Sequence, residues 1–120
     1  MMTPVQFAQV LRMTESNGDP RAWGDADRAV TSYQVHPEWF WDQVQRYRLK
    51  PIAPITWDGW IEQYVWAFYA TYQTDFKPVD VAMHFHLGHY TTADMPDWDR
   101  KYAARFLSFQ VKQEGQSSGS

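Results

Sequence analysis

TPVQFAQVLRMTESNG, at residues 3–18, predicts a complete helix with its own start and stop signals. Thr3 is suited to cap the N-terminus, Pro4 to take the first helical position and Gln6 to complete a capping box. Asn17 and Gly18 are typical of a helix C-terminus. The side chains expected to pack this helix are Val5, Phe7, Val10 and Leu11, with Thr14 in the same stripe.

The rest of the chain continues this helical pattern. Residues 18–35 predict an irregular excursion with a short extended segment near Ala29–Val35. Four further helices are expected: from His36-Pro37 to about Tyr47, from a Thr56 cap to about Tyr72, from Pro78 to Gly88, and from Asp97 or Asp99 to about Val111. The prediction is one mainly α domain over residues 1–114, followed by a flexible tail, 115–120, whose composition is typical of an appended linker.

The composition argues against several classes of function. The chain has 120 residues, which is enough for one core, and its formal net charge of −3 argues against a nucleic-acid partner. The absence of cysteine excludes disulfides and thiolate chemistry. No stretch predicts a membrane span or a secretory signal, and we expect a monomer without a cofactor. Aromatic residues reach 18%, more than a core of this size needs, so some rings are expected at a surface or cleft.

Glu15 is the strongest candidate for catalysis. Glu15 is expected in the C-terminal turn of the first helix, where the negative end of the helix dipole disfavours the charged carboxylate. A carboxyl group that stays protonated is what glycosidic cleavage requires, because the leaving oxygen must receive a proton. The alternative from spacing alone is a solvated glutamate beside an ordinary C-cap at Asn17-Gly18.

The residues after Glu15 carry a family resemblance. ESNGDPRAWGD, at residues 15–25, and SYQVHP, at residues 32–37, resemble the lysozyme-like superfamily, in particular lytic transglycosylases and goose-type and phage lysozymes. The resemblance implies that Glu15 is the catalytic acid, that Ser16 and Tyr33 contact substrate and that Gln34 buttresses the cleft or contacts substrate. AMHFHLG, at residues 82–88, resembles a second family segment with Phe85 in place of its Tyr and His86 in place of its Asn. Phe85 and His86 are therefore further substrate-binding candidates.

The resemblance implies cleavage of peptidoglycan glycan strands, at the bacterial cell wall, in a phage lysis or virion-associated setting. Asp25 and Asp27 are the candidates for a second carboxylate, although they also suit a solvated turn. The transglycosylases work with one Glu and use the acetamido group and a hydroxyl of the substrate. The alternatives are an inactive glycan-binding or virion structural module on the same fold, and an unrelated helical interaction domain.

The histidine pattern does not predict a metal site. His84 and His86 lie about 200° apart on a helical wheel, so both cannot face one ion. Only His86 and His89 share a helix face, and other ligands would have to come from His36 or Asp94. We expect His86 to act as a hydrogen-bonding residue instead.

Aromatic residues crowd every face of the predicted helix from 57 to 72, which is typical of a buried central helix. A second interpretation places some rings in a groove, where they stack on sugars. The candidates for this role are Trp23, Trp39, Trp41 and Tyr90.

Overall fold

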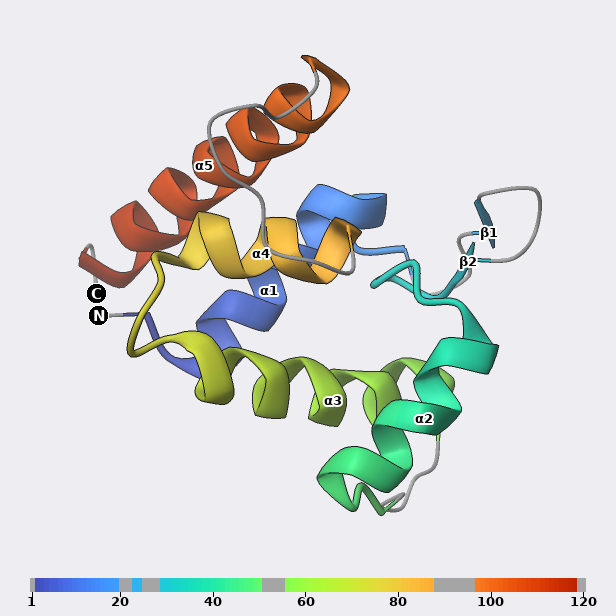
Figure 1. Cartoon of the computed structure of the whole chain (residues 1–120). Helices are drawn as coiled ribbons and strands as arrows, with labels where there is room; N and C mark the ends of the chain where they lie inside the picture. The colour runs from blue at the N-terminus through green and yellow to red at the C-terminus, as the bar shows by residue number, and fades with distance from the viewer. Residues whose placement is uncertain (1, 20–22, 25–28, 51–55, 88–96, 119–120) are drawn as a thin grey trace.

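A computed structural model describes residues 2–19, 23–24, 29–50, 56–87 and 97–118. The element order is α1 (Pro4–Ser16), β1 (Trp23–Gly24), β2 (Ala29–Val30), α2 (Pro37–Tyr47), α3 (Trp57–Tyr72), α4 (Pro78–Leu87) and α5 (Asp97–Ser118). The mainly α class is thereby confirmed (Figure 1). The two short strands pair antiparallel, Trp23 with Val30 and Gly24 with Ala29, within the excursion expected after the first helix.

The first three helices begin as the sequence predicts. The Thr3 hydroxyl accepts a hydrogen bond from the Gln6 N–H, and the Gln6 side chain accepts one from the Thr3 N–H. Pro37 follows the His36 cap of α2, and the Thr56 hydroxyl caps α3 by accepting from the Gly59 N–H. Local start signals therefore fix where each of these helices begins.

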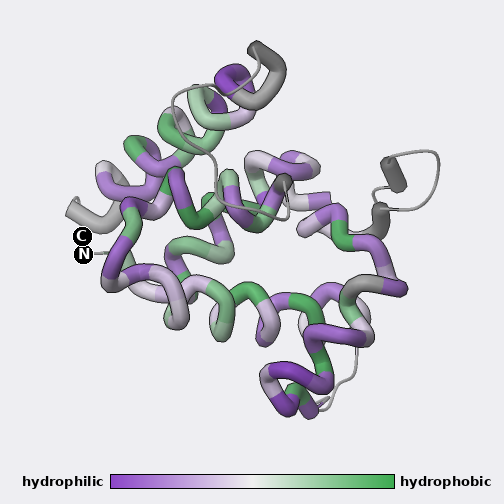
Figure 2. Tube along the Cα trace, in the orientation of Figure 1, coloured by the Kyte–Doolittle hydropathy of each residue, from purple (hydrophilic) through white to green (hydrophobic). Residues whose placement is uncertain are grey.

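The core lies between α1, α3, α4 and α5. The ring of Phe7 in α1 stacks on Tyr69 of α3, with centroids 4.4 Å apart, and approaches Phe106 of α5 at 5.8 Å. Val10, Leu11 and Thr14 of α1 are also buried. Hydrophobic and hydrophilic residues intermingle along the helices, as expected where each helix buries one face (Figure 2). This packing holds α1 against α3 and α5.

Three expectations need correction. Val5 is 49% exposed, because it lies about 200° around α1 from Phe7 and faces away from the core. α3 is central, since it packs against α1, α2 and α4, but Trp57 in its first turn is 47% exposed. α5 does not end near Val111: the residues that follow include good helix formers and it continues to Ser118, so residues 115–118 of the predicted tail are helical.

Candidate functional site

The candidate site is built around the C-terminus of α1, where Glu15 lies in the last turn. The helix ends at Asn17, which adopts the left-handed conformation at φ 58° and caps the helix with its N–H. Gly18 follows at φ 80°, a backbone conformation that glycine adopts without strain. The predicted stop signal thus sets the direction in which the chain leaves Glu15.

Glu15 is in contact with His86, 71 residues away. An oxygen of its carboxylate lies 3.3 Å from Nδ1 of His86 in α4. The Glu15 side chain is 7% exposed and that of His86 is 26% exposed. Two residues that are 71 positions apart in sequence are therefore adjacent, and the tautomer of the imidazole decides whether it donates or accepts the hydrogen bond to the carboxyl group.

Tyr102 of α5 completes this group. Its ring stacks on His86, with centroids 4.0 Å apart and planes 16° apart. Its hydroxyl is buried beside the Glu15 carboxylate. Burial, followed by the nearby Glu15 carboxylate, raises the pKa of Tyr102 well above its usual 10. Tyr102 therefore stays neutral and holds the imidazole by stacking.

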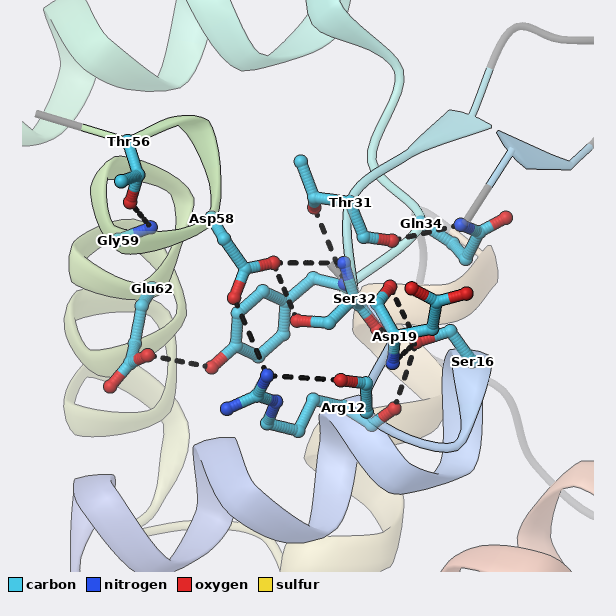
Figure 3. A network of polar contacts seen from close by, with 12 residues as sticks. Arg12, Ser16, Asp19, Thr31, Ser32, Gln34, Thr56, Asp58, Gly59 and Glu62 are labelled. Atoms are coloured by element: carbon cyan, nitrogen blue, oxygen red, sulfur yellow. Dashed lines mark hydrogen bonds and ion pairs between the residues drawn. The ribbon is translucent and has the colours of Figure 1, made fainter. Parts of the chain in front are cut away.

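On the other side of α1, Ser16 connects the helix to the turn at residues 31–34. The Ser16 hydroxyl donates to the Ser32 carbonyl at 2.7 Å (Figure 3). The Ser32 N–H and hydroxyl donate to one oxygen of Asp58 in α3, at 2.8 and 2.6 Å. Arg12 lies 3.6 Å from the other Asp58 oxygen and donates to the Gly18 carbonyl at 3.1 Å. This network holds α1, the turn and the start of α3 together.

The turn itself is shaped by Thr31 and Gln34, both at positive φ. The Gln34 amide donates to the Thr31 carbonyl at 2.8 Å, and the Gln34 N–H donates to the same carbonyl at 3.1 Å. Gln34 is half-buried and stabilises the turn that presents Ser32. Its role beside a substrate cleft stays a prediction.

Tyr33 and Phe85 are core residues rather than surface residues. Tyr33 is fully buried, and its hydroxyl donates to Glu62 at 3.0 Å. Burial, followed by the Glu62 carboxylate, raises the pKa of Tyr33. Phe85 is 6% exposed and stacks on Tyr64 at 5.7 Å. Because neither ring reaches the surface, the expected substrate contact is replaced by a supporting role for both.

The histidines of α4 face different neighbours, as the helical wheel predicts. His84 packs against Phe68 and Tyr72 of α3, with centroids 5.2 and 4.8 Å away, whereas His86 faces Glu15. Within the described ranges, no group of three or more His, Cys, Asp or Glu side chains is placed to hold a metal. Each described helix is also too short or too polar to cross a membrane.

Several predicted residues fall outside what the structure describes: Asp25, Asp27, His89, Tyr90, Asp94, and the side chains of Trp23 and Trp39. Sequence reasoning, in turn, missed Tyr102, Asp58 and Glu62. Tyr102 shares a buried helical stripe with Phe106, four residues on, which predicts burial but not contact with Glu15. Asp58 resembles an ordinary acidic residue in a first helical turn, which conceals its contact with Ser32.

Comparisons with models of known families, with curated proteins and with solved structures found no match to this chain.

Proposed function

We propose that this protein cleaves the glycan strand of peptidoglycan, with Glu15 as the catalytic acid. One observation carries the proposal: the three segments that resemble lysozyme-like enzymes meet at the end of α1. Glu15 contacts His86 of the third segment, and Ser16 donates to the backbone of Ser32 in the second. Ser32, 16 residues after Ser16, and His86, 71 residues after Glu15, thus contact neighbouring residues at the end of one helix.

The proposed chemistry uses one glutamate in two roles. Glu15 gives a proton to the leaving glycosidic oxygen and then removes a proton as base. His86 and Tyr102 hold the carboxyl group in place, and Ser16 and Gln34 fix the backbone beside it. The substrate's acetamido group and a hydroxyl supply the remaining steps, as in the transglycosylases that the sequence resembles.

The proposal favours a transglycosylase over a hydrolase. Asp58 is a second carboxylate near this end of α1, but Ser32 and Arg12 occupy its oxygens. A carboxylate held in this way is poorly suited to activate water. Digested glycan strands should therefore carry anhydro ends, which mass spectrometry separates from reducing ends by one water. Reducing ends alone would indicate a hydrolase, with Asp25 or Asp27 as candidates for the second carboxylate.

Glu15→Gln tests the assignment. Glutamine keeps the shape and a hydrogen bond to His86 but cannot transfer a proton, so wall clearing should fall by roughly 10²–10⁴-fold. The melting temperature should stay close to wild type, because the packing around Glu15 is unchanged. The matched control is Glu114→Gln, the same change at an exposed residue of α5, which should clear walls normally.

The outcomes separate the interpretations. If Glu15→Gln clears walls as fast as wild type, the catalytic role of Glu15 is refuted. If wild type binds purified walls without reducing their turbidity, the chain is the inactive glycan-binding module instead. If it neither binds nor cleaves walls, the helical interaction domain is the better interpretation.

A further inference from the structure

Helix α2 packs beside α3 (Figure 1). Where the two helices meet, the exposed Trp41 and Trp57 and the half-buried Trp60 form an aromatic surface. Trp41 of α2 lies 5.7 Å from Trp57 and 5.1 Å from Trp60 of α3, measured between ring centroids. Trp41 is 46% exposed and Trp57 is 47% exposed. We refer to Trp41, Trp57 and Trp60 as the tryptophan cluster.

The tryptophan cluster is fixed in position by the core beneath it. Phe40 is fully buried and lies 5.2 Å from Trp60, with the two planes 87° apart. Trp41 and Trp57 meet at 75°, so their exposed rings point in different directions and form a corner. Large aromatic surface that is both exposed and rigid is typical of a binding site, because few rotamers are lost on binding.

The polar residues beside the cluster suit a sugar. Helical spacing places Glu38 and Gln45 on the same face of α2 as Trp41, and both side chains are exposed. A carboxylate and an amide can bind sugar hydroxyls and an acetamido N–H, while the C–H face of a pyranose packs on indole. The exposed charges of this region are of both signs, Glu38 and Asp42 followed by Arg46 and Arg48, so the surface lacks the basic excess that an anionic membrane or a nucleic acid would require.

A series of contacts links the start of α3, which carries part of the cluster, to the end of α1. Trp57 directly precedes Asp58, which binds Ser32, and Ser32 in turn binds Ser16 next to Glu15. A glycan strand is a linear polymer that extends beyond the bond being cut. We propose that the tryptophan cluster is a sugar-binding subsite for an N-acetylated glycan strand, away from the cleaved bond. This inference rests on the proposed function only for its choice of ligand.

The test is binding of a soluble N-acetylglucosamine oligomer to the Glu15→Gln protein, in which the oligomer stays intact. The indole N–H signals of Trp41 and Trp57 should shift in NMR spectra, whereas that of the partly buried Trp66 should not. Trp41→Ala and Trp57→Ala should each weaken binding by about tenfold, as truncation of an aromatic anchor typically does. The control is Leu107→Ala on α5, at 45% exposure, which should leave binding unchanged.

Melting curves establish that each variant is folded. The double variant Glu38→Ala, Gln45→Ala tests the same surface without altering the aromatic packing, and it should also weaken binding. The subsite is refuted if the oligomer does not bind, if binding leaves the two exposed indoles unshifted, or if folded variants bind as tightly as the parent. Reversible self-association that Trp41→Ala abolishes, without sugar binding, would show that a second copy covers the cluster. Sugar binding by the cluster without wall cleavage by wild type would retain the subsite and refute the proposed function.

Discussion

Asp58→Ala should destabilise the protein more than any exposed carboxylate does. In the structure one Asp58 oxygen accepts two hydrogen bonds, from the N–H and the hydroxyl of Ser32. Ser32 is fully buried, and both its N–H and its hydroxyl depend on Asp58 as acceptor. The substitution therefore leaves a buried backbone donor unpaired, which is costlier than the simple loss of a hydrogen bond.

The expected cost combines two effects. An unpaired buried N–H costs about 1–3 kcal/mol, and removal of an acidic residue from the first turn of α3 costs about 0.3–1 kcal/mol. The contact with Arg12 adds little, because a 3.6 Å pair with side chains 18% and 32% exposed is screened by solvent. The free energy of unfolding should fall by about 1.3–4 kcal/mol, and the melting temperature by roughly 10 °C.

Thermal and urea unfolding of a short series measures this effect. Asp58→Asn keeps an acceptor for Ser32 and should lose only about 1 kcal/mol, since it removes the charge alone. Ser32→Ala combined with Asp58→Ala should show a coupling energy above about 0.5 kcal/mol. The matched control is Asp42→Ala at an exposed site of α2. If Asp58→Ala has the same melting temperature as Asp42→Ala, the reasoning from the buried donor is refuted.

Three further outcomes are expected. Gln34→Ala should lower the free energy of unfolding by about 0.5–1.5 kcal/mol, because its amide binds the turn carbonyl; an unchanged urea midpoint would contradict this. Gly18→Ala should cost about 1–2 kcal/mol in thermal unfolding, since its φ is +80° and an added methyl group would meet Met13 at 3.1 Å; a melting temperature equal to wild type would contradict the strain. Because the pKa values of Tyr33 and Tyr102 are raised, the folded state keeps protons that the unfolded state loses above pH 10. The free energy of unfolding should therefore be at its full value below pH 10 and fall as the pH rises further. Ultraviolet titration should show these phenols ionising only when the protein unfolds.

Helix starts are the part of this fold that sequence predicts best. The capping box at Thr3, the Pro37 start of α2 and the Thr56 cap of α3 depend on residues within one turn of each other. The stop at Asn17-Gly18 is equally local, since it needs only residues that accept positive φ. Each of these signals is complete in a few residues, so no tertiary contact has to be known.

Side-chain exposure was harder to predict, because it depends on partners elsewhere in the chain. Tyr33 stands beside residues of a predicted site, yet α3 supplies Glu62 to its hydroxyl and the ring becomes buried. Phe85 is buried because Tyr64 and Phe68 meet it from the same helix. The pattern of aromatic residues marks these rings as important without indicating which face of the domain they occupy.

The environment of Glu15 shows why helix position alone is an incomplete guide to a carboxylate. The dipole argument assumes that the last carbonyls of α1 are unpaired and therefore negative. Arg105 of α5 instead donates to the Thr14 carbonyl at 2.9 Å and to the Met13 carbonyl at 3.2 Å, and also contacts the Asn17 side chain. A cation thus offsets the negative end of the helix beside Glu15. The surroundings of this carboxyl group are therefore set by side chains that α4 and α5 bring from distant parts of the chain: His86 lies 3.3 Å from it, and the ring of Tyr102 stacks on His86.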